Sequence, residues 1–154
     1  MRVLCCLDGT NAEQVHRAVS RMLCAETTIG ILYVTDTWPQ EEMERHRERL
    51  LRPPHPPLLR REQMRQAEEA SAQEILEEGK RYLVGAETLQ RTGRPEREIV
   101  NSAAIWHADL IVICSRSTWG GGSSPGPKSV GHVARFVLDH APCPVLLIRP
   151  LYRE

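Results

Sequence analysis

Five short runs along the chain have the pattern of strands, at residues 3–7, 28–34, 87–92, 109–114 and 144–149, and hydrophobic residues dominate all of them except 87–92. Four of these runs are almost continuously apolar, which is typical of strands that are buried on both faces of a sheet. The run at 87–92 contains more polar residues and therefore fits the edge of a sheet. We expect each run to form one β-strand.

Between the runs, apolar residues recur at the spacing of an α-helix. Thr10 with Glu13 predicts a capping box at the start of the first helix. The apolar stripe expected on this helix consists of Ala12, Val15, Val19, Met22 and Leu23. A long, highly charged helix is predicted over residues 62–83, and its modest apolar face would consist of Met64, Ala67, Ser71, Ile75 and Tyr82.

Two further helices follow in the second half of the chain. Pro95 suits the first turn of a helix, and the apolar stripe after it consists of Ile99, Val100, Ala103 and Trp106. The last helix should end before Pro142, and its stripe consists of Val130, Val133, Ala134, Val137, Leu138 and Ala141.

Strands that alternate with helices predict an α/β fold with a doubly wound, five-stranded parallel sheet and helices on both faces. The 154 residues fit a single domain, 1–154. Residues 38–61 interrupt the alternation with charged residues and a proline-rich stretch at 53–57. We expect this part to be an exposed excursion from the domain.

Charge and composition limit the partners of this chain. Its 20 acidic and 20 basic residues balance, so no overall field attracts nucleic acid or an anionic membrane. No apolar run approaches the roughly 20 residues that cross a bilayer. The start of the chain lacks a signal-peptide pattern, and the five cysteines show no disulfide spacing. We therefore expect a cytoplasmic protein with no nucleic-acid or membrane partner.

A glycine-rich loop joins the fourth predicted strand to the last helix. It contains Arg116, Ser117 and Lys128, and Gly131 and His132 follow near the start of the helix. Backbone N–H groups at a helix N-terminus, together with the helix dipole, favour an anion. Arginine and lysine beside such a loop can pair with phosphate oxygens. The pattern favours an anionic ligand, and the alternative is that Arg116 and Lys128 are simply solvated charges of the loop.

Several segments resemble the universal stress protein family over nearly the whole chain. They are residues 3–10, 31–36, 93–99, 108–112 and 131–147. The resemblance implies a sheet in the order 3-2-1-4-5 and a homodimer formed through strand 145–148. It also implies cytoplasmic location and a role in stress survival or signalling.

Some members of that family bind ATP or related adenine nucleotides through the pattern Gly-x2-Gly-x9-Gly-[Ser/Thr]. This chain departs from the pattern, because Cys114 and Ser117 occupy the first two glycine positions and thirteen residues (118–130) precede Gly131. His132 stands where serine or threonine is expected. The implied ligand is ATP or AMP, with Mg²⁺ if it is ATP.

The candidate nucleotide-binding residues lie at the ends of strands one, two and four and at the start of the last helix. They are Leu7, Asp8, Val34, Cys114, Arg116, Ser117, Lys128, Gly131, His132 and Val133. Asp8 could accept hydrogen bonds from a ribose or an adenine amine, or it could simply make the turn before the first helix. Cys114 could be an oxidant-sensing thiol of lowered pKa, or a small buried residue that ends a strand.

The alternative function is a dimeric scaffold that has lost the ligand and acts through protein–protein contacts, with residues 38–61 reaching a partner. Catalysis has little support, because no nucleophile-elbow pattern and no oriented general base occur. We expect no catalytic residue, although slow ATP hydrolysis stays open. The six histidines lack metal-binding spacing, so no metal site is expected.

Overall fold

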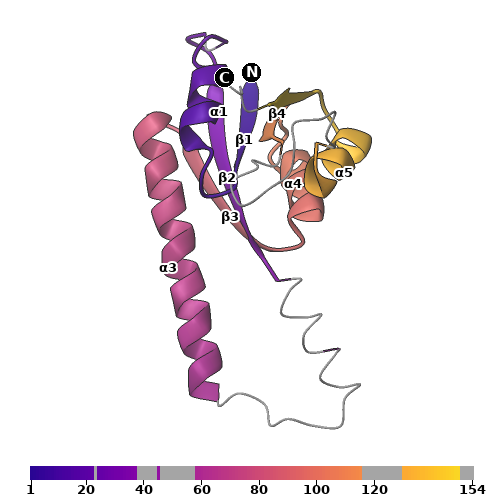
Figure 1. Ribbon diagram of the computed structural model, residues 1–154. Helices are drawn as coiled ribbons and strands as arrows, with labels where there is room; N and C mark the ends of the chain where they lie inside the picture. Colours follow the sequence, from indigo (N-terminus) through magenta and orange to yellow (C-terminus); the bar gives the residue numbers. More distant parts are fainter. Residues whose placement is uncertain (23, 38–44, 46–57, 116–129, 150–154) are drawn as a thin grey trace, which may run out of the picture.

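The computed structural model describes residues 1–22, 24–37, 45, 58–115 and 130–149. Strands and helices alternate along the chain (Figure 1). They are β1 (Arg2–Leu7), α1 (Ala12–Val19), β2 (Thr28–Asp36), α3 (Leu58–Tyr82), β3 (Glu87–Gly93), α4 (Pro95–Ile105), β4 (Leu110–Cys114), α5 (His132–His140) and β5 (Val145–Ile148). Among the described residues, no helix combines the length and the apolar character that a membrane crossing requires.

The five strands form one parallel sheet in the order β3-β2-β1-β4-β5. This confirms the predicted α/β class and the 3-2-1-4-5 order, and it places the polar strand β3 at an edge. Leu7 at the end of β1 pairs with Tyr33 of β2, and Cys5 pairs with Val112 of β4. The carboxyl ends of the three central strands therefore lie at the same edge of the sheet.

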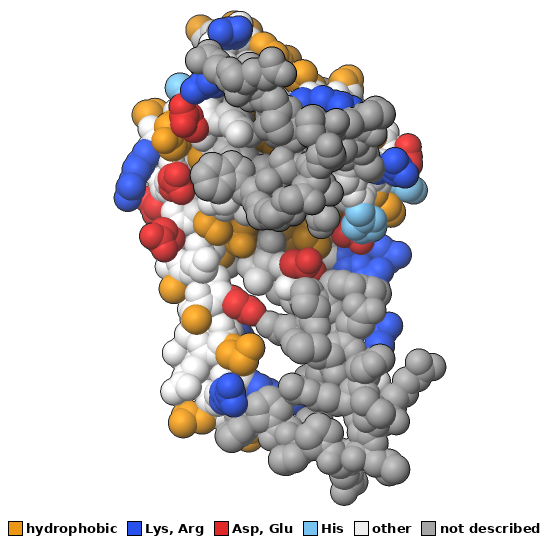
Figure 2. Space-filling model, viewed as in Figure 1, with side chains coloured by type: hydrophobic (Ala, Val, Ile, Leu, Met, Phe, Trp, Pro, Cys, Tyr) orange, Lys and Arg blue, Asp and Glu red, His pale blue; other side chains and the backbone are white. Residues whose placement is uncertain are grey.

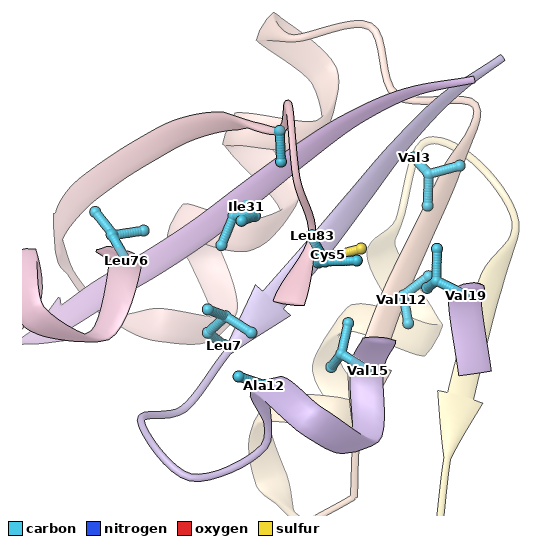
Figure 3. Packing of buried hydrophobic residues seen from close by; sticks show 11 residues of the cluster. Val3, Cys5, Leu7, Ala12, Val15, Val19, Ile31, Leu76, Leu83 and Val112 are labelled. Atoms are coloured by element: carbon cyan, nitrogen blue, oxygen red, sulfur yellow. The ribbon is translucent and has the colours of Figure 1, made fainter. Parts of the chain in front are cut away.

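The core consists of two apolar layers, one on each face of the sheet. Residues of α1 and α3 pack with alternate strand residues on one face (Figure 3). Residues of α4 and α5 pack on the other face. Because successive side chains of a strand point to opposite faces, the neighbours Cys5 and Cys6 fall into different layers. The continuous apolar runs of the sequence thus correspond to strands covered on both sides.

The predicted capping box at the start of α1 is wrong. The helix begins at Ala12 after Asn11, and no side chain caps it. The hydroxyl of Thr10 instead donates a hydrogen bond to Asp8 Oδ1, at 3.0 Å. The helix also ends at Val19, which leaves Met22 beyond it with 40% of its surface exposed. Residue 23 lies outside the described residues.

Helix α3 starts at Leu58 rather than at residue 62, and its buried face differs from the prediction. The buried residues are Ala72, Leu76 and Gly79, all in the second half of the helix. The first half projects past the sheet (Figure 1), so Met64 stays exposed. Of the predicted face, Ile75 packs against the core. In the final helix, Leu138 is likewise exposed although the stripe included it.

The predicted excursion at 38–61 falls mostly outside the described part of the chain. Residues 58–61 belong to α3, which corrects the end of the predicted excursion. Its remaining positions, apart from residue 45, are among the undescribed residues.

Candidate functional site

A cavity of about 400 Å³ opens at the carboxyl ends of β1, β2 and β4. Ligand pockets of proteins span roughly 300–1,000 Å³, so this volume is ordinary for a small-molecule site. The strand ends form one wall of the cavity, and residues 130–134 at the start of α5 form another. Pro95 and Ile99 of α4 complete it.

The strand order explains why the cavity lies here. After β1 the chain moves to β2 and β3 on one side, and it then returns to β4 and β5 on the other side. Helices that follow β1 and β4 therefore leave toward opposite faces of the sheet, and a crevice remains between the two strand ends. Open α/β sheets bind ligands at this switch point.

The cavity brings together the predicted site residues that the structure describes. Those lining it are Leu7, Asp8, Val34, Cys114, Gly131, His132 and Val133. They come from three strands and one helix, separated by up to about 125 positions in the chain. Arg116, Ser117 and Lys128 lie outside the described residues, as do the loop glycines at 120–122 and 126.

Asp8 makes the turn between β1 and α1 and also lines the cavity. Its Oδ1 accepts hydrogen bonds from the backbone N–H and the hydroxyl of Thr10, at 2.8 and 3.0 Å. The turn interpretation is therefore confirmed. Because Asp8 is exposed and borders the cavity, the same side chain is also available to a ligand.

Asn11 supports this turn from inside the protein, with 4% of its surface exposed. Its Oδ1 accepts a hydrogen bond from the backbone N–H of Asp8 at 3.0 Å, and its Nδ2 donates to the carbonyl of Cys6 at 3.1 Å. These bonds fix the end of β1 relative to the first helix, and so they fix the position of Asp8.

The start of α5 gives the cavity its helix N-terminus. Gly131 has φ 97° and ψ 158°, a backbone conformation that side-chain-bearing residues rarely adopt. The first helical hydrogen bond runs from Arg135 N to Gly131 O, at 3.0 Å. The N–H groups of the first turn have no acceptor within the helix, so this wall of the cavity suits an anion.

His132 lies on the rim of the cavity beside a buried carboxylate. Its Nε2 is 3.5 Å from Oε1 of Glu96, which belongs to the first turn of α4. The His132 side chain is 73% exposed, whereas that of Glu96 is 10% exposed. The two groups form an ion pair whenever the imidazole is protonated.

The thiols on the cavity wall are poor nucleophiles. Burial raises the pKa of Cys114 to about 11, although a hydrogen bond with Asn11 opposes the shift. Burial also raises the pKa of Cys6. Since the thiolate is the reactive form, both side chains act near neutral pH as small apolar surfaces. The alternative of Cys114 as a sensor of lowered pKa is wrong.

Some cavity residues escaped the prediction from sequence. They are Cys6, Asn11, Leu32, Tyr33, Asp36, Pro95, Ile99, Ile113, Val130 and Ala134, with Glu96 just behind the rim. Asp36 ends β2 two residues after Val34, and side chains two apart share a face of a strand. This two-residue repeat, counted from Val34, could have predicted Asp36 as a residue of the site. No local pattern places Pro95 or Ile99 at this edge, because their position depends on how α4 packs.

The family comparison agrees with the fold and with the motifs. A model of the universal stress protein family matches residues 1–149. The chain belongs to the universal stress protein family. Comparison with curated protein sequences gives no significant match.

Solved structures of universal stress proteins share the architecture. The protein UspA from Lactobacillus plantarum is 25% identical, with 97% of each chain covered and a TM-score of 0.66. An Arabidopsis thaliana family member with AMP bound is 18% identical, with 99% of this chain and 93% of that chain covered and a TM-score of 0.61. A universal stress protein in complex with cAMP is 18% identical, with 97% and 96% covered and a TM-score of 0.55.

Proposed function

We propose that this universal stress protein binds an adenine nucleotide in the cavity at the ends of β1, β2 and β4. The observation that supports the proposal most is the meeting of Asp8, Val34 and the start of α5 around a cavity of about 400 Å³. This arrangement offers a carboxylate, a strand-end backbone and a helix N-terminus within one site.

Each part of a nucleotide has a suitable surface in this arrangement. Val34 and Ile99 supply an apolar surface for the base. Asp8 offers carboxylate oxygens to the ribose hydroxyls, and the first turn of α5 offers N–H groups to a phosphate. The AMP-bound and cAMP-bound structures of the family show that this fold accommodates such ligands in other proteins.

Isothermal titration calorimetry with ATP, ADP and AMP, each with and without Mg²⁺, tests the proposal. We expect saturable binding of at least one nucleotide. A complete lack of heat and of thermal stabilisation at about millimolar nucleotide, which corresponds to a binding free energy near −4 kcal/mol, would reject it. Release of inorganic phosphate from ATP, measured in the same samples, would reveal hydrolysis beyond simple binding.

A second candidate function is a dimeric scaffold that works through protein–protein contacts in the cytoplasm. The altered glycine pattern at Cys114, Ser117 and His132 favours it. Strand β5 also ends the sheet and is apolar over Val145–Ile148, and an open apolar edge tends to pair with another chain. We propose a homodimer through this strand.

Sedimentation equilibrium distinguishes the two assembly states. A dimer at tens of micromolar, roughly the range in which stable interfaces persist, is the expected result. A monomer at that concentration would contradict assembly through β5. If a monomer binds nucleotide, the nucleotide-binding function is supported and the dimeric scaffold is not.

A further inference from the structure

We propose that Glu96 makes the cavity select ligands of low negative charge, so that adenosine, AMP or a cyclic monophosphate binds better than ADP or ATP. The inference rests on the proposed nucleotide site and specifies the class of ligand that the site takes. It assigns Glu96 the role of a specificity-determining residue.

The position of Glu96 supports this role. The residue is buried, with 8% of its surface exposed, and its Oε1 lies 3.5 Å from Nε2 of His132. His132 is the first residue of α5, where the phosphate groups of a nucleotide would meet the helix N-terminus. A phosphate bound there would lie near the carboxylate of Glu96, and two negative charges close together repel each other.

The other charges around the cavity point in the same direction. Among the described lining residues, Asp8 and Asp36 carry carboxylates, and none is lysine or arginine. His132 is the one described lining residue that can become cationic, and its Nε2 lies within ion-pair distance of Oε1 of Glu96. On the face of the molecule shown in Figure 2, Lys and Arg side chains also lie near the acidic side chains and a histidine, but none of them belongs to the described lining of the cavity. The N-terminus of α5 contributes about half a positive charge, whereas several carboxylates lie around the cavity. Each further phosphate group of a ligand therefore adds repulsion from these carboxylates.

A purely structural role for Glu96 makes a different prediction. Glu96 and Glu98 both lie in the first turn of α4, where acidic residues stabilise the helix dipole. The side chain of Glu98 packs beside Gly93 at the end of β3, whereas that of Glu96 lies 3.5 Å from His132 of α5. Replacing either residue by glutamine removes one charge from the same turn, but only Glu96→Gln removes it beside α5.

Calorimetric titrations with adenosine, AMP, ADP and ATP, all without Mg²⁺, test the inference on the wild type, Glu96→Gln and Glu98→Gln. The wild type should bind ATP about tenfold or more weakly than AMP, since a tenfold difference requires only modest repulsion. Glu96→Gln should bind ATP about tenfold more tightly than the wild type, with adenosine unchanged. Glu98→Gln should keep the wild-type order of affinities.

Each other result contradicts the inference. The titrations of the wild type test the inference even if Glu96→Gln fails to fold. If the wild type binds ATP as tightly as AMP, the site does not select ligands of low negative charge. An unchanged ratio of AMP to ATP affinity in folded Glu96→Gln, or an equal change in Glu98→Gln, would assign Glu96 to helix stability alone. Tight binding of ATP would leave the proposed nucleotide site intact, whereas a lack of binding by all four ligands would reject both.

Discussion

At the scale of single residues, Asp8 combines a structural role with a position on the site. Its Oδ1 holds Thr10 through two hydrogen bonds, and neither bond uses Oδ2. An asparagine at this position would keep the Oδ1 acceptor and replace Oδ2 by an NH₂ donor. One substitution can therefore separate the turn from the proposed ligand contact.

We expect Asp8→Asn to weaken adenosine binding by about tenfold, because the ribose loses a charged hydrogen-bond acceptor worth about 1.5 kcal/mol or more. The free energy of unfolding should change by less than about 1 kcal/mol, since the turn survives. Calorimetry and urea unfolding measure the two quantities. Asp139→Asn, at an exposed position near the end of α5, is the matched control and should bind adenosine normally. Equal affinity in the two variants would show that Asp8 does not contact the ribose.

The buried thiols predict a loss of stability at alkaline pH. Burial raises the pKa of Cys5 to about 12 and that of Cys114 to about 11, from an ordinary value of 9.0. Between pH 9 and pH 11 the unfolded chain therefore binds fewer protons than the native protein. The free energy of unfolding must fall as pH rises through this range, and these thiols have no such effect below it.

Urea unfolding at pH 8, 9 and 10 under reducing conditions measures this effect. The wild type should lose stability between pH 9 and pH 10, and Cys114→Ala should lose less over the same interval. Identical pH dependence in both proteins would mean that Cys114 ionises in the native state as it does in the unfolded chain.

At the scale of elements, α3 approaches the sheet through Gly79. A Cβ atom at this position would lie 2.7 Å from Cδ1 of Leu7 and 3.3 Å from the side chain of Ile31. An alanine here would force the buried Leu7 side chain to shift. Glycine in the helix interior costs about 1 kcal/mol in propensity, and it allows the helix to lie close to the sheet without this shift.

Gly79→Ala should therefore lower the free energy of unfolding by about 1–3 kcal/mol, as overpacked cores do, even though alanine favours helices. Glu78→Ala changes an exposed neighbour on the same helix and should stay within about 0.5 kcal/mol of the wild type. Chemical denaturation of the two variants provides the comparison. A stabilised Gly79→Ala protein would show that α3 lies farther from the sheet.

The same helix shows where prediction from sequence failed. Four of the five strands followed from continuous apolar runs, because burial on both faces leaves a strong signal, whereas β3 is the polar strand at the edge of the sheet. Helix α3 carries charged residues all around, so its pattern could not reveal that only the second half, at Ala72, Leu76 and Gly79, lies on the sheet. At α1, both Thr10 and Asn11 are good capping residues, and the bonds of Thr10 to Asp8 decided against the predicted cap.

At the scale of the whole molecule, the site exists because of the order of the strands. Asp8, Val34 and Gly131 are far apart in the sequence and meet only at the switch point between β1 and β4. Residues that follow strands could be predicted from the sequence and from the family resemblance. The wall formed by Pro95 and Ile99 could not be predicted in this way. Its position depends on how α4 packs against the face of the sheet that α5 also covers.

Amide chemical-shift mapping by NMR shows where an added adenine nucleotide binds. On addition of AMP, we expect the largest shifts at Asp8, Val34 and residues 131–133, while amides in the projecting half of α3 stay unchanged. Unchanged spectra at about millimolar AMP, or shifts confined to surfaces away from the ends of β1, β2 and β4, would contradict binding in this cavity.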